Sequence, residues 1–396
     1  MIGSSNSPTL YDSTVDEPLT TWHASQNGPK THALIIGVGD YLHLPGGQGR
    51  QVEDFVDFQQ LTSAPISARD FAQWMLDEFH NSSAPLGSVE LLLSPPDPFV
   101  LSNGVVRHPC RATMEEIRLA FARWKDRCDT SEKNIAVFYF CGHGLQRESL
   151  ALLAEDFGAH PYAPFQNAID LNRTWQGMGR CKAGAQYYFI DSCRETKWSL
   201  GRNLVDPAAP LIEAHFAVKH YRDAPIFMAT TPGKSAYGMT GQRTVFTGAL
   251  FESLRRGAAK IGGNWVITSH RLAEALASEL KAVSQTLGDI QHSCLEGTMS
   301  GSVFHELKEA PEVKVALCCQ PESATAKAHL EMCDARAPQL PKYRRPKPEP
   351  HPWELKATAG VYVARARFVN SHLSAGELDL WVMPPGPVDG KVPVGP

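Results

Sequence analysis

Two stretches decide the fold class: Phe138–Gly144 (FYFCGHG) and Tyr187–Glu195 (YYFIDSCRE). Each begins as a short apolar run rich in aromatic residues, which is typical of a strand buried on both faces of a sheet. Each then reaches a reactive side chain, His143 in the first stretch and Cys193 in the second. Because open parallel sheets place their ligand crevices beyond the carboxyl ends of the strands, we expect both side chains at one sheet edge.

The rest of the first 300 residues alternates between strand-like and helix-like patterns. The apolar runs of strand length are His32–Val38, Val89–Leu93, Ile135–Phe140, Tyr187–Ile190 and Ile226–Ala229. The segments with a helical pattern are Ala68–Phe79, Met114–Cys128, Val245–Arg256 and His270–Val283. Continuous apolar strands separated by amphipathic helices predict an α/β fold with a mostly parallel sheet flanked by helices.

Changes in composition indicate further regions. Residues 1–30 are rich in Ser, Thr, Asn, Pro and Gly without a hydrophobic period, and they are predicted to be a flexible leader. The α/β domain is predicted at residues 31–308, followed by a linker region rich in Pro, Lys, Glu and Ala at residues 309–350. Residues 351–396 are predicted to be part of a small C-terminal β module, which the pattern allows to begin near residue 312, with a disordered tail.

The overall composition disfavours several classes of protein. The 396 residues carry a formal net charge of -4, which disfavours a nucleic-acid binder or a membrane-surface binder. Prolines interrupt the basic cluster at Lys342–Lys347, which favours a solvated linker over a binding patch. No apolar run approaches the ~20 residues that span a bilayer, and no secretion signal begins the chain. We therefore expect a cytoplasmic protein without membrane partners.

The cysteines are predicted to be reduced thiols. There are nine, an odd number at irregular spacing, which disfavours a disulfide framework. The adjacent pair Cys318 and Cys319 has no second pair of Cys or His ligands nearby, so no zinc site is expected. The sequence thus indicates no metal and no cofactor.

His143 and Cys193 together have the chemistry of thiol catalysis. They lie 50 residues apart, which is enough for the chain to leave one strand and return as its neighbour. A free cysteine with a pKa near ~8.5 is only a few per cent thiolate at neutral pH, so a histidine that takes its proton raises the reactive fraction. The same histidine would protonate the leaving amine, and the N–H groups of Gly144 and Cys193 are candidates to bind the oxyanion. Each residue alone is more often structural, but the pair favours catalysis.

These motifs resemble the caspase/metacaspase superfamily, especially its bacterial members. The resemblance covers roughly residues 30–307 and rests on Gly142–Gly144, Asp191–Arg194 and Ala33–Val38, with weaker similarity at Ala229–Gly233 and Phe246–Phe251. Caspases carry the histidine about 50 residues before the cysteine. The resemblance implies a caspase-like fold and a cysteine endopeptidase that acts on proteins, with Cys193 as nucleophile and His143 as its catalytic partner.

The resemblance also implies a substrate preference. The chain lacks the Gln-Ala-Cys sequence of animal caspases, which cut after Asp, and it has Cys141 where many metacaspases have Ser before Gly-His-Gly. Metacaspases cut after Arg or Lys by means of acidic pocket residues. Asp191 matches one pocket aspartate and Asp70 resembles the other, so Asp70, Asp191 and Cys141 are substrate-binding candidates. The alternatives are an N-cap or first-turn role for Asp70 and a structural role for Asp191.

The stretch between Cys193 and the next strand bears on control. Typical connections run about 2 to 6 residues, and this one is far longer. Within residues 194–224 it contains Arg202 and Arg222, which are candidate sites for activation by self-cleavage or by an upstream protease. An uncut loop is the alternative. Calcium dependence is compatible with the resemblance, although no residue pattern indicates it.

Two other functions stay open from the sequence. One is a non-catalytic caspase-fold scaffold or sensor that acts through the C-terminal β module. The other is a transferase or hydrolase of a different α/β family with Cys193 as nucleophile. The resemblance to bacterial members also carries an expectation of a role in stress or antiphage defence.

Overall fold

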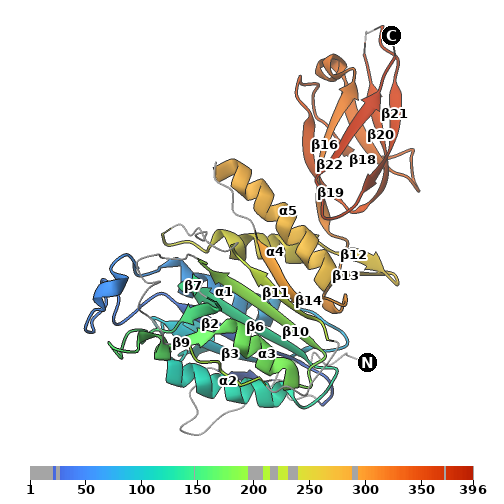
Figure 1. Cartoon of the computed structure of the whole chain (residues 1–396). Coiled ribbons are helices and arrows are strands. Elements are labelled where there is room, and N and C mark those ends of the chain that lie inside the picture. Colours follow the sequence, from blue (N-terminus) through green and yellow to red (C-terminus); the bar gives the residue numbers. More distant parts are fainter. Residues whose placement is uncertain are drawn as a thin grey trace. The chain divides into compact units, whose positions relative to one another are not determined.

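The computed structural model describes residues 21–23, 27–146, 148–194, 208–214, 222–230, 240–287, 293–369 and 372–395 (Figure 1). The chain divides into two compact units. The first comprises Met1–Phe251 with Glu279–His305, and the second comprises Glu252–Ser278 with Glu306–Pro396.

A sheet with seven described strands forms the centre of the first unit, in the order β1-β3-β2-β6-β10-β11-β14. The strands are β1 (Thr21–His23), β2 (Thr31–Val38), β3 (Leu86–Ser94), β6 (Ile135–Gly142), β10 (Ala185–Ser192), β11 (Ala224–Met228) and β14 (Cys294–Thr298). The inner five run parallel, while β1 and β14 pair antiparallel at the edges. Every residue of β2, β6 and β10 is buried, which accounts for their continuous apolar sequences. The predicted mostly parallel α/β fold is confirmed.

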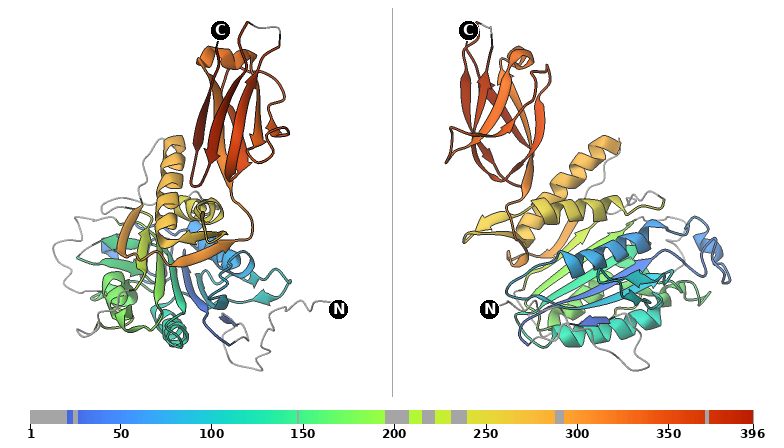
Figure 2. Two further views of the ribbon diagram at one scale, coloured as in Figure 1. Left: turned by 90° about the vertical axis from the view of Figure 1, so that its right-hand side faces the viewer. Right: turned by 180° about the vertical axis from the view of Figure 1, so that it is seen from behind.

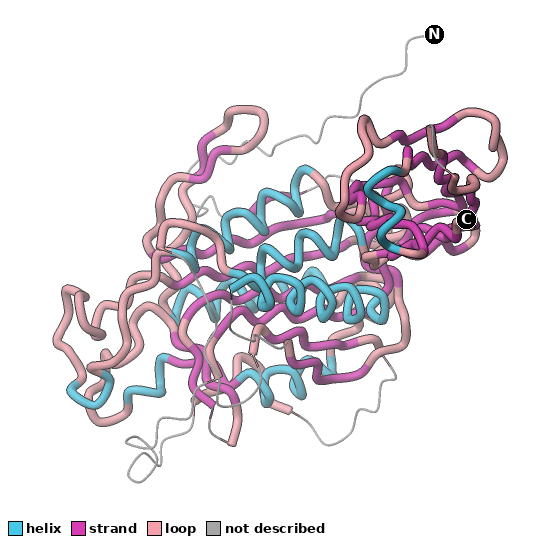
Figure 3. The backbone as a smooth tube through the Cα atoms, turned by 90° about the horizontal axis from the view of Figure 1, so that it is seen from above, coloured by secondary structure: helices cyan, strands magenta, loops and turns pink. Residues whose placement is uncertain are grey.

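Helices cover both faces of this sheet (Figure 2; Figure 3). The α-helices in the described ranges are α1 (Ser63–Asp77), α2 (Met114–Cys128), α3 (Leu171–Gly177), α4 (Val245–Arg256) and α5 (Ser269–Leu287). Phe71 of α1 stacks on Tyr139 of β6, with ring centroids 4.5 Å apart. Trp124 of α2 packs near Phe138, the residue before Tyr139 in β6, with ring centroids 6.3 Å apart. Because successive side chains of a strand point to opposite faces, α1 and α2 lie on opposite sides of the sheet.

The ends of α2 show how local sequence sets a helix. The Thr113 side chain accepts a hydrogen bond from the Glu116 N–H and caps the first turn. Glu115 lies in that turn and Arg127 in the last one, so their charges complement the helix dipole. The observed bounds agree with those that the sequence predicts.

Short strands lie beside the carboxyl edge of the sheet. β7 (Gly144–Gln146), β8 (Leu150–Leu153) and β9 (Ala168–Asp170) form a small antiparallel sheet. β6 ends at Gly142 and β7 begins at Gly144, so His143 lies between two strands. The remaining short elements are β4 (Phe99–Val100), β5 (Val106–Arg107), β12 (Ala259–Ile261), β13 (Asn264–Thr268), β15 (Val303–Leu307) and the 3-10 turns Glu53–Phe55, Pro164–Asn167, Met178–Arg180 and Glu322–Lys327.

The C-terminal part of the second unit is a β sandwich. One sheet has the order β19-β16-β22 and the other β18-β17-β20-β21. The strands are β16 (Glu312–Gln320), β17 (His329–Asp334), β18 (Pro341–Arg344), β19 (Trp353–Thr358), β20 (Gly360–Arg367), β21 (Gly376–Val382) and β22 (Val388–Pro393). Val315 and Leu317 of one sheet share a buried core with Met332 and Ala364 of the other. The sheets are thus two halves of one small fold.

The structure corrects three expected boundaries. Residues 309–350 are not a linker, because β16, β17 and β18 lie within them and alternate residues of β16, such as Val313 and Val315, are buried. The β module begins with β16 at Glu312, the earlier of the two starts that the sequence allows. The tail is not disordered through residue 395: β22 pairs with β16, and a Cβ at Gly390 would lie 2.4 Å from Leu317, so this glycine permits close packing. Thr21–His23 of the predicted leader form β1.

Candidate active site

The pairing of β6 with β10 brings the two predicted catalytic residues to neighbouring positions. The strands run parallel with Asp191 opposite Cys141 and Ser192 opposite Gly142. His143 directly follows β6 and Cys193 directly follows β10, so both lie at the carboxyl edge of the sheet. Both are partly exposed, whereas the strand residues before them are buried. A histidine and a cysteine are therefore presented side by side at an accessible edge.

Gly144 permits the backbones behind this pair to approach closely. A Cβ at position 144 would lie 2.6 Å from the Cys193 carbonyl oxygen and 2.6 Å from the Ser192 hydroxyl oxygen. These distances are shorter than real Cβ contacts allow, so a side chain here would displace the backbone of Cys193. The glycine thus keeps the Gly144 and Cys193 backbones together, as a shared oxyanion site requires.

Three residues of the segment between β2 and α1 hold the His143 ring. Its Nε2 lies 2.7 Å from the Gln59 carbonyl oxygen, and its ring lies 4.9 Å from those of Tyr41 and Phe58. Since a carbonyl only accepts hydrogen bonds, Nε2 carries the proton, and Nδ1 is the basic nitrogen of the neutral ring. The backbone N–H of His143 also donates to the buried Tyr41 hydroxyl, at 2.7 Å.

This segment holds its own shape through the side chain of Gln60. The Gln60 amide accepts from the Tyr41 N–H at 2.6 Å and donates to the carbonyls of Tyr41 and Pro45, at 3.1 and 2.8 Å. The sequence analysis identified none of Tyr41, Phe58 and Gln59. The available signal was the length of the connection from Val38 to Ser63, because connections this long tend to be functional.

Asp191 is buried beside the N-terminal end of α4. Its Oδ2 accepts hydrogen bonds from the hydroxyls of Thr244 and Thr247, the second at 2.7 Å. Among the described residues no hydrogen-bond partner reaches its other oxygen, Oδ1. Burial raises the pKa of Asp191 from 3.8 to about 6, against the opposing effect of the two threonines. Burial, with the nearby Asp191 charge, also raises the pKa of the Cys141 thiol well above its usual range.

Asp70 forms an ion pair with Arg243, the residue before Thr244. Asp70 lies in the middle of α1 rather than at its N-cap, and its Oδ2 pairs with Arg243 Nη2 at 3.0 Å. The residue of α1 that reaches the surroundings of Asp191 is Ser67, whose hydroxyl accepts from the Thr244 N–H at 2.9 Å. Sequence reasoning identified Asp70 and missed Ser67, one turn earlier on the same helix.

The two candidate processing sites differ. Arg202 lies outside the described residues. The Arg222 carbonyl accepts from the Thr298 hydroxyl at 2.9 Å, and the following N–H, of Asp223, donates to the Gly184 carbonyl at 3.2 Å. The peptide bond after Arg222 is therefore held on both sides, and a protease would have to unfold this part of the sheet to cut it.

Two searches of the described residues bear on metals and membranes. No three His, Cys, Asp or Glu side chains in the described ranges gather as metal ligands would. Among the described helices, none has the length and apolar character needed to cross a membrane.

A parallel sheet whose adjacent strands lead into a histidine and a cysteine defines the class of caspase-like folds. The model of the caspase domain family matches residues 30–313, and the chain belongs to this family. The chain is 30% identical over 253 residues to a Sinorhizobium fredii protein described as uncharacterized protein y4kE, a match that spans 62% of this chain and 73% of that protein. It is also similar to the crystal structure of caspase-1 from Spodoptera frugiperda, with a TM-score of 0.42, 13% identity, and coverage of 76% of this chain and 99% of that one.

Proposed function

We propose that this protein is a cysteine endopeptidase that cuts proteins after Arg or Lys, with Cys193 as nucleophile and His143 as general acid and base. The observation that carries the proposal is the register of β6 and β10, which places these residues at neighbouring positions. Membership of the caspase domain family supports the same chemistry.

The reaction follows from the roles of these groups. His143 takes the proton of the Cys193 thiol, the thiolate attacks the scissile carbonyl carbon, and the N–H groups of Gly144 and Cys193 bind the oxyanion. The C–N bond then breaks, His143 gives its proton to the leaving amine, and a thioester to Cys193 remains. Water attacks the thioester while His143 takes its proton, which releases the new carboxyl group and regenerates the cysteine.

Asp191 supports the preference for a basic residue. A buried carboxylate oxygen without a partner is costly, and a substrate ammonium or guanidinium would supply the missing donor and charge. Asp70 pairs with Arg243, so the proposal assigns the positive charge of the substrate to Asp191 alone. The proposal therefore includes Lys as well as Arg, with Cys141 and Ser67 beside the carboxylate.

Labelling of Cys193 tests the proposal. A peptidyl arginyl chloromethylketone should form a mass adduct on Cys193 at least about 100-fold faster than the matched aspartyl reagent, because the pocket charge favours the cation. Mass spectrometry of peptic peptides locates the adduct. If neither reagent reacts while iodoacetamide still alkylates Cys193, the chain is a caspase-fold scaffold rather than a peptidase. Cleavage of ester or thioester substrates but no amides would indicate the other class of enzyme.

Activation by cleavage within residues 194–224 is part of the proposal, and its expected position can be tested. Purified wild-type protein and the Cys193→Ala variant are incubated in parallel and compared on a denaturing gel. We expect a new terminus after Arg202 in the wild type alone, because the bond after Arg222 is held by hydrogen bonds on both sides. A terminus after Arg222, or full activity of an intact chain, would contradict this prediction. A role in stress or antiphage defence has only the family resemblance behind it.

A further inference from the structure

Arg194 directly follows the proposed nucleophile, and only 5% of it is exposed. Burying a guanidinium is costly unless hydrogen bonds and an opposite charge compensate it. The side chains that contact Arg194 should therefore show why the arginine is buried beside the proposed nucleophile.

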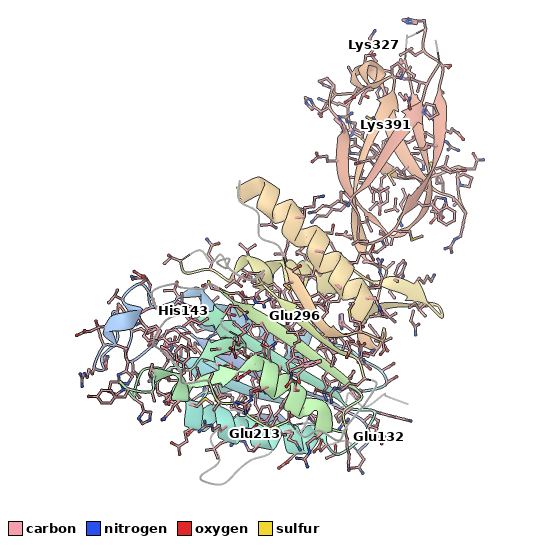
Figure 4. The ribbon with its side chains drawn as sticks, in the orientation of Figure 1. Glu132, His143, Glu213, Glu296, Lys327 and Lys391 are labelled. Carbon is pink, nitrogen blue, oxygen red and sulfur yellow. The ribbon has the colours of Figure 1, made fainter. Side chains whose placement is uncertain are left out.

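Two side chains from different sheets compensate Arg194. Its Nε donates to Gln146 Oε1 at 2.9 Å, and its Nη1 lies 3.1 Å from Glu296 Oε1 as an ion pair without hydrogen-bond geometry. Gln146 is the last residue of β7, the strand that begins at Gly144. Glu296 lies in the middle of the edge strand β14. Figure 4 labels Glu296 and His143 in the first unit.

We infer that Arg194 is a positioning residue that holds Cys193 against Gly144 through Gln146 and Glu296. The inference rests on the proposed role of Cys193. The Cys193 carbonyl lies against Gly144, the first residue of β7. The Arg194 side chain donates a hydrogen bond to Gln146, the last residue of the same strand. Without the Glu296 charge, the buried Arg194 cation loses the ion-pair partner that the described residues give it. It then moves toward water and takes the Cys193 backbone with it.

The test uses Glu296→Gln, Arg194→Lys and their double variant in the full chain. Glu296→Gln keeps the size of the side chain and removes its charge, while a lysine keeps the charge of Arg194 but cannot reach both partners as a planar fork does. We expect kcat on an arginyl amide to fall about tenfold or more in each single variant, with KM within about twofold. The double variant should lose little more than either single variant, because both remove one interaction.

A second readout keeps this inference separate from the proposed activity. The rate of Cys193 alkylation by iodoacetamide, followed by mass spectrometry, should fall about tenfold at pH 7 in the same variants, because a displaced thiol is activated less well. A wild type that cleaves no peptide while the variants still alkylate more slowly would sink the peptidase proposal but keep the positioning role.

The matched control is Glu213→Gln, which removes a carboxylate from the exposed ion pair with Arg173, 2.9 Å apart. Figure 4 labels Glu213. Its kcat and alkylation rate should equal those of the wild type. Unchanged kinetics in Glu296→Gln and Arg194→Lys would overturn the inference. So would losses that a thermal melt attributes to unfolded protein.

Discussion

Replacing Cys193 with alanine is expected to reduce peptide cleavage by at least about ten-thousand-fold, because no other group can form the covalent intermediate. The free energy of unfolding should change little, since the thiol is partly exposed and only one sulfur atom is lost. The measurements are kcat/KM on an arginyl amide and a thermal melt of the same preparation.

The matched control for this variant is Cys110→Ala, which removes another partly exposed thiol outside the two motifs. It should cleave at the wild-type rate. Residual cleavage by Cys193→Ala at more than a trace level would mean that another residue is the nucleophile, and the assignment from the strand register would fail.

Replacing Asp191 with asparagine is expected to lower kcat/KM on arginyl and lysyl substrates by at least about 100-fold. Breaking one side of a buried charge pair costs about 3 to 5 kcal/mol, and an amide cannot balance the substrate charge. The comparison is Asp70→Asn, which removes a partly exposed partner of Arg243 and should have a much smaller effect. Equal losses in both variants would contradict the separation of the two aspartates.

The same substitution should stabilise the folded protein at neutral pH. Burial raises the pKa of Asp191 from 3.8 to about 6, so its ionisation opposes folding. This penalty is absent well below pH 3.8, where the group is protonated in both states, grows between about pH 4 and pH 6, and is complete above that range. A pKa difference of this size corresponds to about 3 kcal/mol as an upper bound.

Urea unfolding of wild type and Asp191→Asn at pH 4 and pH 7.5 measures this effect. The variant should gain stability over the wild type at the higher pH and lose most of that gain at the lower one. A variant that is destabilised more at pH 7.5 than at pH 4 would show that the ionised carboxylate supports the fold. Asp191 would then be a structural residue, as the alternative interpretation holds.

Local patterns predicted the inner strands of the sheet and the long helices, but not β14, α3 or the short strands β7–β9, and they placed the start of α1 at Ala68 rather than Ser63. The helices at Met114–Cys128 and Val245–Arg256 have the expected bounds, because capping residues and a 3.6-residue period act within a few residues. The second unit was harder to delimit. Its Pro- and Gly-rich stretches resemble linkers by composition, yet they contain strands: Gly390 lies within β22 and pairs with Leu317 of β16.

The α/β class, the caspase-like resemblance and the choice of His143 and Cys193 could all be predicted from the sequence. Buried strands and the reactive residues that follow them are encoded by patterns only a few residues long. The side chains that surround these two residues could be identified only from the folded structure. Gln59 approaches His143 across 84 residues, Thr244 reaches Asp191 across 53, and Ser67 contacts Thr244 across 177. No local pattern predicts contacts between residues so far apart in the sequence, because the order of the strands and the packing of the helices bring these side chains together. For the same reason the ion pair of Asp70 with Arg243, 173 residues away in the chain, could not be read from the sequence.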